Sequence, residues 1–232
     1  MSNMPLTDGI NALTRYANET TGKSDTTLSD AVESLVAGYG GGGGWSTDGI
    51  IAGTEPSGAI SSNATTACYG ALAGNSAITS LYLPLLETVK ERSFNRMSAL
   101  TNFVAPKMTY TESYLFANST ALKSIDILGA AKIDGRSAIA NNSFENCYAF
   151  DTMIIRNTSE VMKLNNLNAF NYTPFRGYNS QTGTLYASSS LVESYKTANN
   201  WKSLYEAGFI TILPIEGSIY ETQYADGTPI TT

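Results

Sequence analysis

One pattern of apolar residues recurs about every 22 residues, and this period constrains the fold more than any other feature of the chain. A large apolar residue opens each unit at Leu72, Phe94, Phe116 and Phe144, and further apolar residues follow it at its sixth, ninth and eleventh positions. These are Ile78, Leu100, Leu122 and Phe150, then Leu81, Phe103, Ile125 and Met153, then Leu83, Ala105, Ile127 and Ile155. A period of roughly 20–50 residues is typical of a solenoid, in which each repeat forms one coil.

The ninth and eleventh positions alternate with polar neighbours, which is the period of a strand buried on one side. A weaker inward position lies five residues before three of the units, at Val89, Thr111 and Ile139. A single coil buries too few side chains to offset the entropy of ordering it, but stacked coils share one core. The sequence therefore predicts a β-rich solenoid with one strand in each coil.

The third interval is longer than the others, because 28 residues separate Phe116 from Phe144. The additional residues lie in GAAKIDGRS, residues 129–137. Insertions in solenoids project from one face and leave the stack intact. This one is either a tolerated loop or a functional departure from the repeat.

The eighth and tenth positions of the units are predicted to point outward and to form a candidate binding face. The residues are Ser80, Asn102, Ser124 and Thr152 in one row, and Tyr82, Val104, Asp126 and Ile154 in the other, with Tyr82 and Asp126 as the strongest two candidates. Five strands at about 4.8 Å each give a face of only a few hundred Å², whereas a specific protein interface takes about 800 Å² per partner. Useful affinity therefore requires many copies. The alternative is a merely solvated face.

The repeat resembles the leucine-rich repeats of BspA-type bacterial proteins. FENCYAF, residues 144–150, matches the Phe-x-x-Cys-x-x-Leu turn of that family, and Asn75, Met97 and Ser119 fill the position of Cys147 in the other units. The resemblance implies a short leucine-rich-repeat solenoid over roughly residues 60–217. It also implies that Cys147 is a buried repeat residue and not a reactive thiol.

The C-terminal stretch, residues 168–217, resembles the terminal cap of such arrays, in which a last strand leads into a short helix and then a closing strand. The helix is expected around residues 191–201. Leu191, Val192, Tyr195 and Trp201 provide a face that can cover the open end of the stack, as solenoids require. The predicted solenoid with its caps spans residues 45–217. Residues 218–232 are a C-terminal tail whose order the sequence leaves open.

Residues 1–39 are predicted to form a separate module of two short helices, followed by a glycine linker at residues 40–44. Helices of about three turns are not stable alone in water, so they form a self-contained hairpin or an attachment and oligomerisation module. Five consecutive glycines are flexible. This leader resembles tail-associated structural proteins of phages and prophages, which implies that residues 1–39 contact other virion proteins.

Composition removes several functional classes. The formal charge of −6 argues against nucleic acid as a partner, and no apolar run reaches the roughly 20 residues of a membrane span. The start of the chain lacks the features of a secretory signal. The chain has no histidine, the spacing of Cys68 and Cys147 matches no zinc motif, and no carboxylate pair is singled out. We therefore expect no catalytic residues, no metal and no cofactor.

The sequence thus predicts a non-enzymatic, multi-copy or homo-oligomeric protein on the surface of a phage particle. It is expected to belong to the tail or a fibre and to bind a host cell-surface glycan or protein. One alternative is a structural decoration, such as a head fibre or tail ornament. Another is a bacterial cell-surface leucine-rich-repeat adhesin, which would need an export route.

Overall fold

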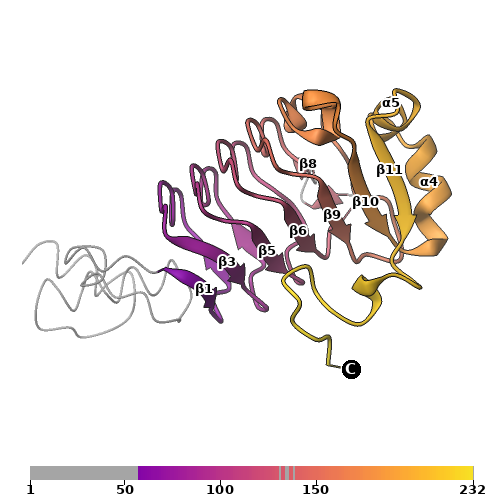
Figure 1. Cartoon of the computed structure of the whole chain (residues 1–232). Helices are drawn as coiled ribbons and strands as arrows, with labels where there is room; N and C mark the ends of the chain where they lie inside the picture. The colour runs from indigo at the N-terminus through magenta and orange to yellow at the C-terminus, as the bar shows by residue number, and fades with distance from the viewer. Residues whose placement is uncertain (1–56, 131, 134–135, 138, 232) are drawn as a thin grey trace, which may run out of the picture.

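The computed structural model describes residues 57–130, 132–133, 136–137 and 139–231. The predicted N-terminal module, residues 1–39, and the glycine linker, residues 40–44, lie outside the described residues. Figure 1 shows the described chain winding into coils stacked side by side, so that their strands form one continuous sheet. The predicted solenoid with one strand per coil is confirmed.

The sheet has seven parallel strands in the order β1-β3-β5-β6-β9-β10-β11. Its register places Leu81, Phe103, Ile125 and Met153 opposite one another on successive strands. The sheet extends beyond the four repeat units seen in the sequence, because β1 precedes the first unit and β10 and β11 follow the last. The bounds are β1 Gly58–Ser61, β3 Ile78–Tyr82, β5 Asn102–Ala105, β6 Ser124–Ile127, β9 Thr152–Ile155, β10 Gly183–Ala187 and β11 Ile210–Pro214.

The core lies inside the coils and is built from the repeated apolar positions. All sixteen residues of the pattern are buried, as are Val89, Thr111 and Ile139. The opening phenylalanines stack along the solenoid, with ring centroids 5.6 Å apart for Phe94 and Phe116 and 5.4 Å apart for Phe116 and Phe144. Phe170 continues the series 5.5 Å from Phe144 and marks one further coil. Burying each such side chain contributes about 1.5–3 kcal/mol.

The turns are held by backbone hydrogen bonds between neighbouring coils. Two residues after each opening residue, the backbone adopts φ between 58° and 83° and its N–H donates to a carbonyl of the next coil over 2.8–3.0 Å. Glycine and asparagine tolerate this left-handed conformation best. The residues at this position are Gly74, Arg96, Asn118 and Asn146.

Side chains at the position of Cys147 satisfy buried backbone groups, which belong to the adjacent coil for Ser119 and Cys147 and to the same coil for Asn75. The Ser119 hydroxyl donates to the Phe94 carbonyl over 3.0 Å, and the Cys147 thiol donates to the Phe116 carbonyl over 3.1 Å. The Asn75 side chain accepts from the Ile78 N–H over 2.8 Å. Burial raises the pKa of Cys147 far above its usual range, so the thiol stays protonated. Cys147 is a buried repeat residue, as expected.

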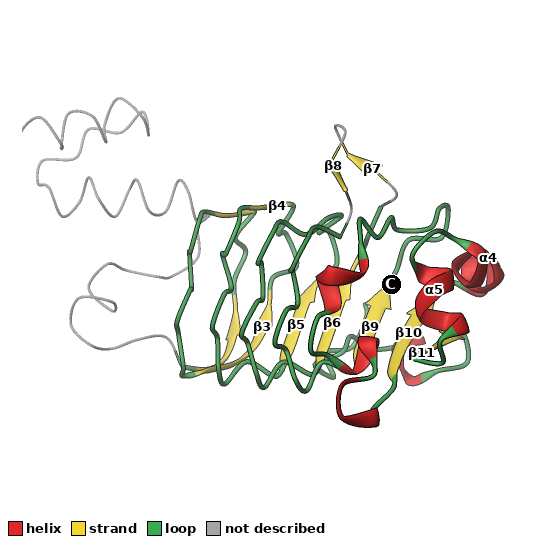
Figure 2. Ribbon diagram, turned by 90° about the horizontal axis from the view of Figure 1, so that it is seen from above, coloured by secondary structure: helices red, strands yellow, loops and turns green. Residues whose placement is uncertain are grey.

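Two pairs of very short strands lie outside the main sheet. β2 (Thr66–Ala67) and β4 (Thr88–Val89) pair in parallel. β7 (Lys132–Ile133) and β8 (Arg136–Ser137) pair in an antiparallel manner within the 129–137 insertion. Figure 2 shows β7 and β8 projecting away from the stack. β6 and β9, on either side of the insertion, still pair over four residues, so the insertion leaves the stack intact.

The C-terminal end is closed by helices and a last strand, as predicted. β10 leads into η4 (Ser189–Leu191), α4 (Val192–Thr197) and α5 (Trp201–Glu206), and the chain returns as β11. Asn200, with φ 65°, separates the two helices where the sequence predicted one. Tyr195 and Trp201 are fully buried, and the Trp201 indole N–H donates to the Met162 carbonyl over 2.8 Å.

Short 3-10 helices complete the structure. η1 (Leu167–Phe170), η2 (Pro174–Arg176) and η3 (Tyr178–Ser180) lie before β10, and η5 (Ile219–Glu221) follows β11. Of the described helices, none has the length and apolar character needed to cross a membrane.

Candidate binding face

The eight predicted outward residues form two straight rows on the face of the sheet opposite the core. Ser80, Asn102, Ser124 and Thr152 are paired in sequence across β3, β5, β6 and β9, as are Tyr82, Val104, Asp126 and Ile154. Thr184 and Thr211 extend the first row, and Tyr186 and Leu213 extend the second. The two rows are called the first row and the second row below.

The second row is largely covered, which corrects the expectation of an open face. Val104, Asp126 and Ile154 have no exposed surface. Val104 and Ile154 are buried although they lie outside the cluster that forms the main hydrophobic core. The cause is the C-terminal segment, residues 218–231, which runs back over the sheet (Figure 1). This segment is called the tail below.

An ion pair joins the sheet to the tail. The Arg156 guanidinium donates twice to the Asp126 carboxylate, with Nε to Oδ1 and Nη2 to Oδ2 both 2.6 Å. The same guanidinium donates to the tail carbonyls of Tyr220 over 3.0 Å and Gln223 over 3.1 Å. The Ala225 N–H donates to Asp126 Oδ2 over 3.0 Å. Both charged groups are thus satisfied jointly by each other and by tail backbone.

Aromatic side chains make further contacts between the sheet and the tail. The rings of Tyr186 and Tyr220 have centroids 4.7 Å apart, and those of Tyr82 and Tyr224 are 5.7 Å apart. The Tyr224 ring also lies 4.8 Å from the Arg156 guanidinium, within the range of a cation–π interaction. The tail folds back on itself, since the Ile230 N–H donates to the Thr222 carbonyl over 2.9 Å.

The covered position perturbs two titratable groups. Burial raises the pKa of Asp126, while the Arg156 guanidinium and the Ala225 N–H act in the opposite direction. Burial also raises the pKa of Tyr82, with Tyr224 and Asp226 adding to the effect. A carboxylate buried in this way needs its guanidinium partner, because an unpaired buried charge is strongly unfavourable.

The first row stays partly open and is uncharged. Ser80, Asn102 and Thr152 are partly exposed. The Ser124 hydroxyl donates to Asn102 Oδ1 over 2.8 Å, and the Asn102 side-chain amide donates to Thr101 Oγ1 over 3.0 Å. Hydroxyl and amide groups arranged at strand spacing offer hydrogen-bond donors and acceptors to a ligand that lies across the sheet.

Sequence reasoning identified Tyr82 and Asp126 but missed Arg156, Tyr186 and the tail residues that meet them. One signal was present. Asp126 is a charge between Ile125 and Ile127 in an apolar strand, and Arg156 follows the next strand 30 residues later, close to the 28-residue interval. A carboxylate within a buried sheet calls for a cation on a neighbouring strand.

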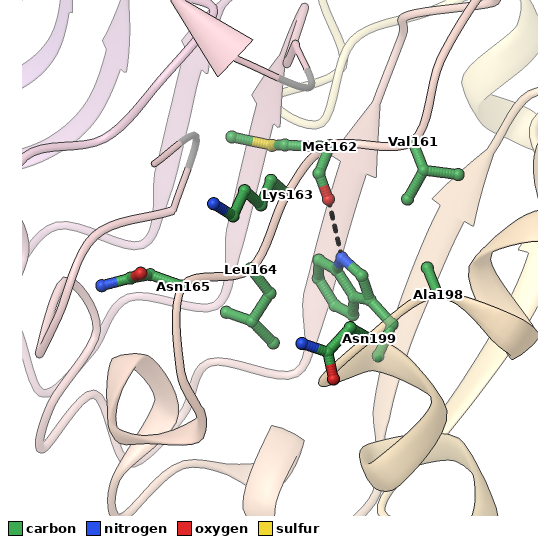
Figure 3. A pocket seen from close by; sticks show the side chains of 8 residues that line it. Val161, Met162, Lys163, Leu164, Asn165, Ala198 and Asn199 are labelled. Atoms are coloured by element: carbon green, nitrogen blue, oxygen red, sulfur yellow. Dashed lines mark hydrogen bonds between the residues drawn. The ribbon is translucent and has the colours of Figure 1, made fainter. Parts of the chain in front are cut away.

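A hollow lies between residues 161–165 and the junction of α4 and α5 (Figure 3). Its volume is about 380 Å³, and Lys163 is the one ionisable residue among those lining it. The Trp201 indole N–H that borders it is already bound to the Met162 carbonyl. The lining residues therefore offer no acid and base pair. In the described part of the chain no group of three or more His, Cys, Asp or Glu residues is placed to hold a metal ion.

The comparisons agree with this architecture. A family model described as "BspA type Leucine rich repeat region" matches residues 65–189 in six copies. The match spans more than half of the 232 residues and runs from the residue before β2 to the start of η4 in the terminal cap. Searches of curated proteins and of solved structures found no match.

Proposed function

The chain belongs to the family of BspA-type leucine-rich repeat proteins, and from that premise we propose that it is a non-catalytic binding protein which attaches a phage particle to its host. Residues 1–39 would fix it to other virion proteins, and the repeats would face the host surface. The observation that carries the binding role is the first row of the outer sheet face, which stays partly open and has residues of like position aligned across successive strands.

The chemistry of the first row supports a polar ligand. The hydroxyl and amide groups of Ser80, Asn102 and Thr152 are aligned, partly exposed and uncharged, so they suit the hydroxyls of a surface glycan or the backbone of a surface protein. Because the open area is small, we expect weak binding by one copy and useful adhesion only from many.

A bacterial cell-surface adhesin is the second candidate, and the family match favours it. The placement on a virion rests on the sequence of residues 1–44 alone, which lie outside the described residues. A structural decoration is the third candidate. Deleting residues 1–44 should abolish incorporation into particles if the protein is a virion component, whether it binds a host or only decorates the particle.

The binding role is tested by making the protein multivalent on fluorescent beads and measuring bead adhesion to a panel of bacterial strains and of animal cells. We expect the Asn102→Ala, Thr152→Ala double variant to lose adhesion at least fivefold. Thr120→Ala, an exposed turn position away from the sheet, is the matched control and should adhere like the original chain.

Each outcome separates the candidates. Adhesion to bacterial strains supports the phage role, and adhesion to animal cells supports the bacterial adhesin. Beads that adhere to no cell, or adhesion that the double variant leaves unchanged, would contradict a binding role for the first row and favour a structural decoration.

A further inference from the structure

The second row already holds a segment of polypeptide, namely the tail, which runs through the 3-10 helix η5 and then folds back on itself. Its contacts show what kind of ligand fits there. The polar contacts reach backbone groups of the tail: the carbonyls of Tyr220 and Gln223 and the N–H of Ala225. Every peptide carries such groups. The side-chain contacts are two tyrosine rings, Tyr220 and Tyr224, which lie against Tyr186 and Tyr82.

The two sides of this contact differ in burial. On the sheet, Val104, Asp126 and Ile154 are completely covered. In the tail, residues 218–231 are all exposed or only partly buried. The tail therefore buries sheet residues while it remains partly exposed itself. A segment with so little buried surface detaches at a lower free energy than is needed to unfold the core.

We propose that Asp126, Arg156, Tyr82 and Tyr186 form a binding site for a protein segment that folds back on itself and carries two aromatic side chains four residues apart, and that the tail is a built-in competitor for it. The inference rests on the proposed function, since it takes the outer face as the binding surface. It goes further by naming protein, not glycan, as the ligand and by assigning the tail the role of controlling access.

The chemistry of the site favours a peptide over a sugar. The Asp126 carboxylate accepts a backbone N–H beside a guanidinium that donates to backbone carbonyls, so the site binds both the donor and the acceptor groups of a peptide backbone. Because the tail is tethered to the site, it competes at an effective concentration of about the millimolar range. A partner must therefore be multivalent or better matched than the tail to displace it.

The test uses the full-length chain and a fluorescein-labelled synthetic peptide with the sequence of residues 218–231. In one variant, Tyr220→Ala and Tyr224→Ala weaken the competitor and leave the sheet unchanged. Fluorescence polarisation should show the peptide binding this variant at least tenfold more tightly than the original chain. Adding Arg156→Ala to the variant should remove that gain, whereas adding Thr120→Ala should not.

Hydrogen exchange on the original chain gives a second, independent reading. The N–H groups of Ala225 and Ile230 should exchange at least tenfold faster than those of Phe103 and Ile125, because the tail opens without unfolding the coils. Equal exchange rates would contradict a detachable tail.

The failures of the two proposals can be told apart. Equal peptide affinity for the original chain and the tail variant, or no binding to either while both remain folded by circular dichroism, would overturn the peptide site. Bead adhesion through the first row would then still support the proposed function. Tighter binding of a glycan array, and not of the peptide, to the tail variant would overturn the ligand class alone.

Discussion

The two faces of the sheet are covered in different ways, although they are built from alternate residues of the same strands. On the inner face, side chains such as Phe103 and Ile125 are completely buried in one core that the repeated apolar residues of all the coils share. On the outer face, Val104 and Asp126 are equally buried, but one unrepeated segment from the end of the chain covers them. The inner cover cannot leave without unfolding the stack, whereas the outer cover can.

The buried polar groups of the two faces also differ in where their hydrogen-bond partners come from. Buried polar side chains of the repeat turns, such as Ser119, bond to backbone of an adjacent coil. Asp126 depends on Arg156 and on the backbone of the tail, 99 residues further along the chain. Solvent can take over the second set of contacts when the tail leaves, so the outer face has two accessible states and the inner face has one.

The largest effect is expected where the inner stack is broken. Phe116 packs between Phe94 and Phe144 at 5.6 and 5.4 Å and contacts Phe103 at 4.8 Å. Phe116→Ala should lower the free energy of unfolding by about 3–5 kcal/mol, because it leaves a cavity that neighbouring coils cannot fill. Urea denaturation followed by circular dichroism measures this. A loss below about 1 kcal/mol would mean that the coils do not share one core.

The repeated part of this fold could be predicted from the sequence, because each buried position of the coil recurs as an apolar residue in several units. Leu81, Phe103, Ile125 and Met153 each occupy the same position of the unit, so an error at one is corrected by the other three. The continuation at Phe170 was missed because the last coil departs from the 22-residue spacing before β10 begins.

The covering of the outer face could not be predicted in this way. The contacts of Arg156 with Tyr220 and Gln223 span 64 and 67 residues, and each occurs once. No period marks Tyr220 or Tyr224 as partners of the sheet. Tyr82 and Asp126 were correctly placed on the outer face, but their neighbours there depend on a single long-range contact, which alternation along a strand does not reveal.

Two glycines with positive φ allow the stability of the coils and of the tail to be compared by the same substitution. One packs against the core and the other lies in the tail. Gly129 has φ 69°, and a Cβ there would lie 2.6 Å from Ile155 Cγ2 and 3.0 Å from Met162 Sδ. Gly129→Ala should lower the free energy of unfolding by about 1–3 kcal/mol through overpacking and backbone strain.

Gly227 in the tail is the matched control. It also has positive φ, at 86°, but a Cβ there would meet nothing within 4 Å. Gly227→Ala should leave global unfolding by urea unchanged within about 0.5 kcal/mol, because the strain is released when the tail detaches. Equal losses in the two variants would show that the tail and the coils unfold as one unit.

Breaking the ion pair between Asp126 and Arg156 should also detach the tail without unfolding the coils, and should cost less free energy of unfolding than a change in the core. Removing one partner of a buried pair usually costs about 3–5 kcal/mol. In Arg156→Ala the tail can lift away and return Asp126 to water, so we expect the loss in urea denaturation to be no more than about 1–2 kcal/mol. Limited proteolysis should show the tail cleaved at least tenfold faster. A full loss with an unchanged cleavage rate would mean that the tail is fixed.

A smaller loss of stability than for the ion pair is expected in the first row, where each substitution removes one side-chain hydrogen bond. Asn102 accepts a hydrogen bond from Ser124 over 2.8 Å, and its side chain is partly exposed. Asn102→Ala and Ser124→Ala should each lower the free energy of unfolding by about 0.5–1 kcal/mol, the net worth of such a bond. The double variant should lose less than the sum of the two, because both single changes remove the same contact. Additive losses would mean that the two side chains act independently, and the row would then be a set of solvated groups without a fixed arrangement for a ligand.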